Sequence, residues 1–246
     1  MPVSETLLIA ALFFAAAALY ASVGHAGASG YLAIMGLFEL TPAVMKPTAL
    51  SLNILVALVA TLKFYRAGLF SWDLFWPFAV VSIPMAFVGG ALTLPAREYK
   101  IVVGFVLLYA AVWMFRSALR PLTMEVKPPP IWAAFIAGTA IGFLSGLVGV
   151  GGGIFLSPLL IYMGWSATRA ASGVAAPFIL VNSVAGLVGH LSSVADVPAG
   201  IPVWGAVVVL GGWIGASYGS RRAPAPVLRQ LLSLVLVVAG AKMVFF

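Results

Sequence analysis

The sequence predicts an all-α, polytopic membrane protein made of two tandem, inverted repeats of about four hydrophobic segments each. Hydrophobic residues make up 63% of the 246 residues and charged residues only 8%, whereas a soluble domain has ~45–50% apolar and ~25% charged residues. Apolar stretches long enough to cross a bilayer follow one another along the whole chain. The second half of the chain also repeats features of the first half at a constant spacing. Together these three observations predict the fold class.

Most of the apolar stretches fit one helix of ~20 residues, which crosses ~30 Å of hydrocarbon. Two of them, 5–38 and 131–163, are too long for one ordinary helix, and each contains a glycine cluster, Gly24–Gly30 or Gly146–Gly153. We therefore expect the first segment of each repeat to be broken at its glycine-rich motif. In chain order, the stretches are 5–38, 48–64, 74–94, 98–115, 131–163, 171–191, 201–219 and 226–246.

The apolar run from Leu7 to Leu19 has the length of a signal-peptide core. The residues before it include Glu5 and no Lys or Arg, and more membrane sequence follows it. Because a signal peptide begins with a positively charged region, we interpret this run as the first membrane segment.

The two halves align without a gap at a shift of 125 positions, which is the spacing from Gly24 to Gly149. The same shift places Pro77 on Pro202. Between the halves, the run Pro128-Pro129-Pro130 is incompatible with a helix interior, because proline lacks the amide hydrogen that a helix needs. The predicted division is 1–115 for the first membrane repeat, 116–130 for a Pro-rich cytoplasmic linker and 131–246 for the second membrane repeat.

The distribution of Lys and Arg predicts the orientation of the repeats. If each broken segment enters the membrane and returns, each half crosses an odd net number of times and the repeats are inverted. Lys46, Arg97, Lys100 and Lys242 then lie at one end, and the other nine of the 13 Lys and Arg lie at the linker end. Since cytoplasmic loops are enriched in Lys and Arg, this predicts a cytoplasmic linker and both termini outside. If the broken segments cross the membrane once, the 13 Lys and Arg divide seven to six between the two sides, and this gives no orientation.

The two glycine clusters are the expected place for chemistry. Non-helical backbone at membrane depth occurs only where it is buried in protein or lines a wet cavity. A helix that restarts there presents unpaired amide hydrogens and the positive end of its dipole, which together bind anions. Two such breaks related by pseudo-symmetry would place two helix starts around one central site. Close helix packing is the alternative, and it is the interpretation that we prefer for Gly211, Gly215 and Gly219, whose spacing is typical of helix contacts.

These motifs resemble those of the TauE/SafE sulfite exporter family. The resemblance rests on the runs Ser22–Tyr31 and Met45–Asn53, and on Gly149–Gly153 followed by Ser157-Pro158, and it covers essentially the whole chain. Membership of that family implies transport of sulfite, thiosulfate or organosulfonates across the bacterial cytoplasmic (inner) membrane, usually as export. The resemblance fixes neither the substrate nor the direction.

Several polar residues are candidates for binding the anion, each with a structural alternative. Lys46 either faces the anion or is a loop lysine reaching the membrane surface. Asn53 and Asn182 lie inside equivalent segments, where they either donate to the anion or join helices, since buried amides in a membrane need partners. His25 either titrates and couples protons to transport, or makes a structural hydrogen bond. The full set of substrate-binding candidates is Gly24, His25, Ala26, Gly27, Ala28, Ser29, Lys46, Thr48, Asn53, Gly149, Gly151, Gly152, Gly153, Ser157, Ser172 and Asn182.

The composition excludes several other functions. The net charge of +7 comes from Lys and Arg scattered singly between apolar runs, which indicates membrane orientation rather than nucleic-acid binding. With no cysteine there are no disulfides or thiolate metal sites, and no ATP-binding, zinc-protease or hydrolase motif is present. We therefore expect no enzyme activity and no cofactor. The expected partners are a small inorganic or organosulfonate anion and the lipid bilayer, with protons or other ions as candidate coupling partners. Import of the same anions, or a non-transporting scaffold or assembly role, are the alternatives.

Overall fold

The computed structural model describes residues 3–119, 126–191, 200–222 and 226–245, and within these ranges all regular structure is helical. Seven of the helices are long and apolar enough to cross a membrane. Residues 120–125 of the predicted linker lie outside the described ranges. The helices are α1 (Val3–Ser22), α2 (Ala28–Leu37), α3 (Pro42–Arg66), α4 (Trp72–Ala91), α5 (Ala96–Leu119), α6 (Ile131–Val148), α7 (Gly153–Tyr162), α8 (Thr168–His190), α9 (Ile201–Arg221) and α10 (Pro226–Phe245).

Both overlong segments are split, as the glycine clusters predicted. The first becomes α1 and α2 and the second becomes α6 and α7. The 125-residue shift carries the start of α2, Ala28, onto Gly153, where α7 starts, and both helices have 10 residues. In the described part of the chain, the eight apolar stretches therefore correspond to ten helices, five in each half.

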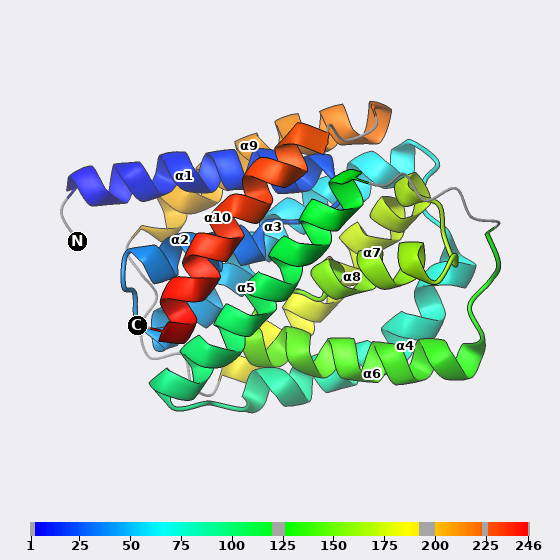
Figure 1. Ribbon diagram of the computed structural model, residues 1–246, viewed down its shortest axis with the longest axis horizontal. Helices are drawn as coiled ribbons and strands as arrows, with labels where there is room; N and C mark the ends of the chain where they lie inside the picture. Colours follow the sequence, from blue (N-terminus) through cyan, green and yellow to red (C-terminus); the bar gives the residue numbers. More distant parts are fainter. Residues whose placement is uncertain (1–2, 120–125, 192–199, 223–225, 246) are drawn as a thin grey trace.

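Each split segment folds as a hairpin. In Figure 1, α1 runs toward the middle of the molecule and α2 runs back beside it, and the Tyr31 ring of α2 meets the Phe13 ring of α1 edge to face with centroids 5.1 Å apart. In the second half, the amide of Lys127, just before α6, donates to the carbonyl oxygen of Gly164, just after α7, at 2.9 Å. The start of α6 and the end of α7 therefore lie at the same end of the molecule.

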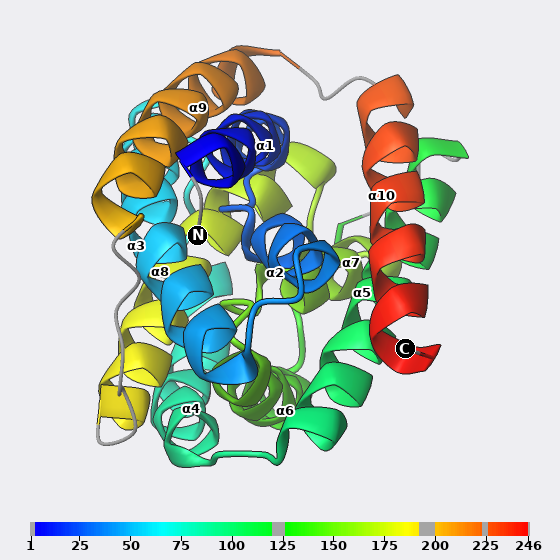
Figure 2. The same ribbon diagram turned by 90° about the vertical axis from the view of Figure 1, so that its left-hand side faces the viewer.

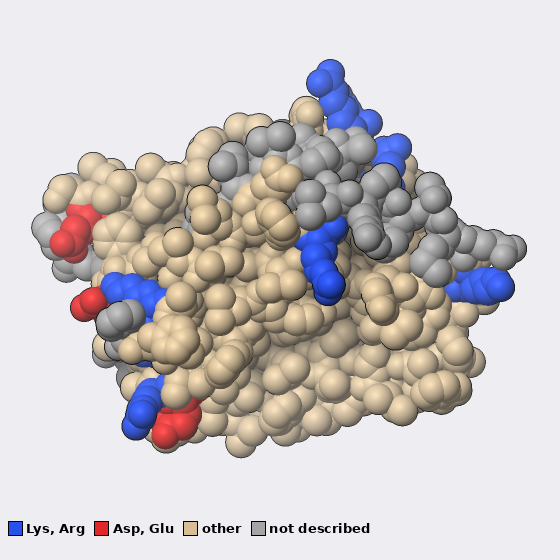
Figure 3. Space-filling view, in the orientation of Figure 1, with Lys and Arg blue, Asp and Glu red and all other residues tan. Residues whose placement is uncertain are grey.

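The start of α1 and the end of α10 lie at one end of the bundle, and the end of α5 and the start of α6 lie toward the other (Figure 1). We call these the terminus end and the linker end. At the terminus end, the ammonium of Lys242, in the last turn of α10, donates to the carbonyl oxygen of Leu37 at 3.0 Å and to the carboxylate of Glu39 at 3.1 Å. On the face shown in Figure 3, the acidic side chains gather at the terminus end, whereas Lys and Arg occur at both ends.

The helices pack in pairs, and each pair consists of one helix from each half. Helix α1 packs on α9 and α6 packs on α4, while α5 packs on α10 and α3 packs on α8. Seen along the bundle, α2 lies near its centre, surrounded by these pairs (Figure 2), and eight of its ten residues are buried. Helix α2, which follows the first glycine break, thus lies in the interior of the molecule.

Glycines bring the paired helices into backbone contact. On α9, a Cβ atom at Gly211, Gly215 or Gly219 would overlap main-chain atoms of α1, which confirms the packing role expected for these three residues. A similar row on α6 faces α4 and consists of Gly138, Gly142 and Gly146. In a membrane, small residues allow the close helix approach from which packing energy arises.

The predicted helix boundaries differ most from the observed ones at α3. The apolar pattern placed its start near residue 48, whereas the helix begins at Pro42, a residue suited to the first helical position because its missing amide hydrogen is not needed there. Lys46 and Pro47 therefore lie inside the helix, and the Lys46 side chain is only 3% exposed. The interpretation of Lys46 as a loop lysine reaching the membrane surface is consequently wrong.

Candidate functional site

The two breaks consist of glycines in the left-handed backbone region. Gly24 and Gly27 have φ of 79° and 103°, and Gly149, Gly151 and Gly152 have φ of 92°, 75° and 82°. Side chains disfavour this conformation by ~1–2 kcal/mol per residue, so glycine allows the chain to turn sharply between two helices. The breaks therefore follow directly from the local sequence.

Each break lies against the long central helix of the opposite half. The hydroxyl of Ser172, on α8, donates to the carbonyl oxygen of Val23 at 2.9 Å, and Gly24 leaves no room for a side chain beside Ser172. In the second break, a Cβ atom at Gly149 would stand 3.3 Å from the Lys46 side chain of α3. Each break is thus in contact with a helix of the other half.

Asn53, on α3, connects the two breaks. Its Oδ1 accepts a hydrogen bond at 3.2 Å from the amide of Ala28, the first residue of α2. Its Nδ2 donates to the carbonyl oxygen of Val150 in the second break at 3.3 Å and to the hydroxyl of Ser183 on α8 at 3.1 Å. With a side chain that is 1% exposed, Asn53 is a buried hub joining both halves.

The starts of α2 and α7 retain amide hydrogens that could bind an anion. Neither helix has a side-chain cap from its own N-cap residue, Gly27 or Gly152. In α2, Asn53 accepts from the first amide and the helix's own bonding resumes at Tyr31. In α7 it resumes at Phe155. Among the described residues, no acceptor is bonded to the amides between these points, which belong to Ser29, Gly30, Gly153 and Ile154.

His25 spans the two breaks. Its Nδ1 lies 3.2 Å from the carbonyl oxygen of Val23, and its Nε2 lies 3.1 Å from the carbonyl oxygen of Gly153. Its ring is 6.4 Å from that of Trp113 on α5. The residue is 6% exposed, so the imidazole is buried between α7 and the first break.

Lys46 is directed at the end of α4 rather than at the breaks. Its ammonium donates to the carbonyl oxygens of Gly90 at 2.8 Å, Leu92 at 3.0 Å and Gly89 at 3.4 Å. A cation at a helix C-terminus is favoured by the free carbonyls and by the helix dipole. Arg169, on α8, does the same in the other half, where its Nη2 donates to the carbonyl oxygen of Ser220 near the end of α9 at 2.8 Å.

The comparisons with known proteins identify the family. The family model described as sulfite exporter TauE/SafE matches residues 8–243. The chain belongs to the TauE/SafE family. It is 41% identical over 245 residues to the "Probable membrane transporter protein y4hK" of Sinorhizobium fredii, covering 98% of this chain and 99% of that protein. It is 22% identical over 231 residues to the "Probable membrane transporter protein YunE" of Bacillus subtilis, covering 84% of this chain and 82% of that protein. No solved structure matches the chain significantly.

This TauE/SafE protein is therefore a multi-pass membrane transporter and not an enzyme. The described residues contain no group of three or more His, Cys, Asp or Glu placed to hold a metal ion. Their carboxylates, those of Glu5, Glu39, Asp73 and Glu98, lie in the first turns of helices or in a connecting turn. Glu125 and Asp196 are outside the described ranges.

Three further polar candidates for the site are buried. Each has one side-chain atom that lacks a hydrogen-bond partner. Within the described residues, Thr48 Oγ1, Ser157 Oγ and Asn182 Oδ1 accept and donate no hydrogen bond. Asn182 Nδ2 donates to the carbonyl oxygen of Phe178 on its own helix, at 2.8 Å. A buried polar group without a partner is destabilising, and these three atoms are among those that lack one in the described structure.

Two tyrosines at the breaks were not predicted as site residues. The hydroxyl of Tyr31 donates to the carbonyl oxygen of Ala26, and that of Tyr99 on α5 donates to the carbonyl oxygen of Val148, both at 2.8 Å. Both side chains are almost completely buried. A tyrosine inside an apolar segment needs a partner for its hydroxyl, which is the signal that could have identified them.

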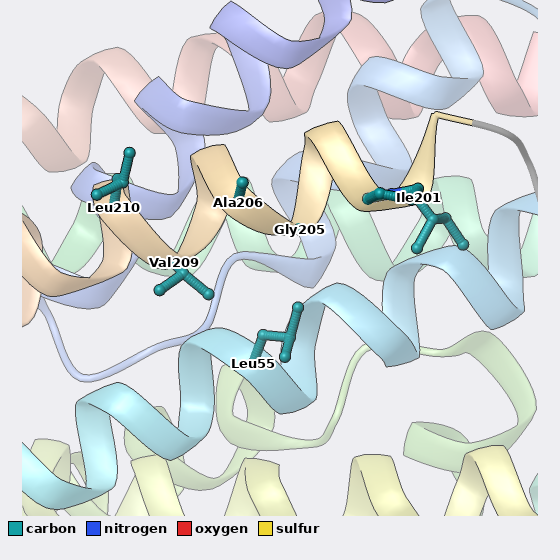
Figure 4. Close-up of a pocket in the computed structure, with 7 residues that line it drawn as sticks. Leu55, Ile201, Gly205, Ala206, Val209 and Leu210 are labelled. Atoms are coloured by element: carbon teal, nitrogen blue, oxygen red, sulfur yellow. The ribbon is translucent and has the colours of Figure 1, made fainter.

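The breaks themselves are tightly packed. A Cβ atom at Gly27 would stand 2.8 Å from the Tyr31 ring, and one at Gly152 would stand 2.9 Å from the Phe178 ring. Two grooves on the described residues lie elsewhere. One, of about 580 Å³, lies between α3 and α9 (Figure 4), and the other, of about 440 Å³, lies along α4 between Trp72 and Ile83. Neither of these two grooves is lined by residues of the breaks.

Proposed function

We propose that the chain is a secondary transporter that exports small sulfur-containing anions, namely sulfite, thiosulfate or organosulfonates, by alternating access. One observation carries the proposal: α2 and α7 both start inside the protein, with the amides of Ser29, Gly30, Gly153 and Ile154 bonded to no described acceptor. Such amides and the positive helix ends favour an oxyanion. The sulfonate and sulfite oxygens accept hydrogen bonds in the way that a phosphate does.

The proposed site consists of the two breaks and the polar side chains facing them. The Asn53 carboxamide holds the start of α2 beside the second break and contributes polarity there. The unsatisfied atoms of Thr48, Ser157 and Asn182 would line the approach, and Ser172 would hold the first break through Val23. In full, it comprises Gly24–Ser29, Thr48, Asn53, Gly149, Gly151–Gly153, Ser157, Ser172 and Asn182.

Lys46 has a supporting role in this proposal. Its ammonium has three hydrogens, and three carbonyl oxygens at the end of α4 accept from it. No donor remains to coordinate the anion directly. Its charge still acts on the nearby second break, where Gly149 approaches its side chain, and its bonds hold α4 in place.

The repeats, 1–115 and 131–246, are proposed to be inverted, with the 116–130 linker cytoplasmic and the termini on the outer side of the bacterial inner membrane. The helix pairs between the halves and the hairpins formed by α1–α2 and α6–α7 support this orientation. The cations support it too. Lys63 and Arg66 end α3, and Arg116 and Arg221 lie in the last turns of α5 and α9, all at the linker end.

Alternating access would use the tightly paired helices as rigid bodies. The glycine rows fasten α1 to α9 and α4 to α6 through backbone contacts, whereas the breaks are joined by a few side-chain hydrogen bonds from Asn53, His25 and Ser172. Rocking of one pair against the other would open the breaks alternately to the two sides. Protons are the candidate coupling ion, with His25 as the residue at the junction.

Purified protein in liposomes tests the proposal. Labelled sulfite, thiosulfate and a taurine-like sulfonate are placed on one side, and flux is measured for wild type, Asn53→Ala and the control Ser82→Ala, whose hydroxyl bonds only within α4. We expect flux of at least one anion, unchanged in the control and lost in Asn53→Ala. Gradients imposed in either direction separate export from import. No flux of any of the three anions in well-folded protein would leave the scaffold role as the better account.

A further inference from the structure

We propose that the groove between α3 and α9 binds an acyl chain of an anionic phospholipid, whose headgroup lies on the cations at the linker end of α3. The inference concerns the membrane-facing surface and does not depend on which solute is transported. Its observations are the shape and lining of the groove, and the positive charge beyond its end, which no described carboxylate neutralises.

The groove is a depression made by small residues. Its volume is about 580 Å³, within the ~300–1,000 Å³ typical of small-molecule sites. Gly205 and Ala206 leave the space, while Leu55 of α3 and Val209 of α9 point toward each other across it (Figure 4). A Cβ atom at Gly205 would already stand 3.2 Å from Leu55 Cδ1. Every lining side chain is apolar, as an acyl chain requires: Leu55, Ile201, Pro202, Ala206, Val209 and Leu210.

The same two helices carry positive charge beyond the groove. Lys63, about 12 Å further along α3 than Leu55 at 1.5 Å per residue, places its ammonium 3.6 Å from the centre of the Trp213 ring on α9. Arg66 follows in the last turn of α3. Among the described residues, no carboxylate forms an ion pair with Lys63 or Arg66. Trp213, which is 54% exposed, has the amphipathic ring that favours the headgroup region.

This arrangement matches both parts of a phospholipid, the headgroup and the acyl chain. The phosphate and a negatively charged headgroup would lie on Lys63 and Arg66, at the depth of Trp213, and an acyl chain would run down past Leu210 and Val209 into the groove. Each Lys or Arg near an anionic membrane surface adds a favourable interaction. A second copy of the chain fits less well, because a two-fold axis through the groove would bring the same cations of both copies together.

Native mass spectrometry of the detergent-purified protein tests the site. Phosphatidylglycerol and phosphatidylcholine with identical acyl chains serve as probes. The variants are Ala206→Phe, which fills the groove, and Lys63→Gln with Arg66→Gln, which removes its charge. The matched controls are Val88→Phe on the exposed face of α4 and Arg116→Gln in the last turn of α5, also at the linker end. Thermal melting confirms that each variant is folded.

We expect wild type to retain about tenfold more phosphatidylglycerol than phosphatidylcholine. Ala206→Phe should lose bound lipid of both kinds, and the charge variant should retain both lipids equally, while the two controls match wild type. Equal retention of the two lipids by wild type, or undiminished retention by Ala206→Phe, would overturn the proposal. So would a dimer of wild type that Ala206→Phe converts to a monomer, since the groove would then be an interface between copies.

Discussion

Asn53 Nδ2 donates a hydrogen bond to the carbonyl oxygen of Val150 at 3.3 Å, which joins the central helix of the first half to the glycine break of the second. The same side chain accepts from the first amide of α2. One carboxamide therefore fixes the distance between the two helix starts that form the proposed site. The predictions below follow from this junction and from the contacts around it.

Asn53→Ala should reduce anion flux at least about tenfold and lower stability by about 1–3 kcal/mol, because buried donors and acceptors lose their partner. The measurement is flux in liposomes together with thermal melting in detergent. Ser82→Ala removes a buried hydroxyl that bonds only to Ala79 of its own helix, and should change neither. If both variants melt alike and transport alike, Asn53 does not organise the site.

Alanine at Gly27 or Gly152 should abolish flux while the protein still reaches the membrane. Both glycines have positive φ, and an added Cβ would stand 2.8 Å from the Tyr31 ring or 2.9 Å from the Phe178 ring. Gly68→Ala is the matched control, since its φ is also positive, at 70°, but nothing lies within 4 Å of the added atom. In all three variants, alanine in the left-handed backbone region costs ~1–2 kcal/mol. Only the crowding around the added Cβ atom therefore distinguishes the two break variants from the control. Wild-type flux in both break variants would remove the breaks from the site.

Lys46→Met should lower the free energy of unfolding by about 2 kcal/mol, because three carbonyl oxygens at the end of α4 lose a charged donor. Lys242→Met is the comparison. Its ammonium also bonds a carbonyl and a carboxylate, but at the protein surface such pairs are worth only ~0–1 kcal/mol. Thermal melting of the two variants should therefore differ clearly. Equal melting temperatures would show that the cation at the end of α4 contributes little.

Gly215→Val should destabilise the bundle by about 3 kcal/mol or more, since its Cβ would overlap the main chain of Ala18 and force α9 away from α1. Gly205→Ala, on the same helix, meets only the flexible end of Leu55 at 3.2 Å and should melt close to wild type. Monodispersity after purification and melting in detergent measure both. A stable Gly215→Val would contradict the close approach of these helices.

Inverted repeats place Arg97 and Arg222, which the shift of 125 positions makes equivalent, on opposite sides of the membrane. Because the chain has no cysteine, single Arg97→Cys and Arg222→Cys variants can be labelled without background by a membrane-impermeant maleimide. In intact cells, we expect labelling at position 97 only, and at both positions after permeabilisation. Labelling of position 222 alone in intact cells would reverse the proposed orientation, and labelling of both would contradict the inverted repeats.

The sequence by itself determined the parts that depend on local chemistry. Long apolar stretches need a bilayer, and clusters of glycine such as 149–153 interrupt helices because only glycine enters the left-handed region freely. The helical membrane fold, the two breaks and the spacing of Gly211, Gly215 and Gly219 on one helix face follow from these properties. The family resemblance rested on the same motifs.

Only the tertiary structure decided which groups meet. No local pattern says that Asn53 reaches Val150, 97 positions away, or that Lys46 donates to a carbonyl oxygen at the end of α4. The partner of a buried polar group is set by whichever helix packs beside it, and in a uniformly apolar chain that choice depends on the fit of small residues between helices rather than on hydrophobicity. The periodicity of the sequence therefore predicts the elements, and their packing determines the site.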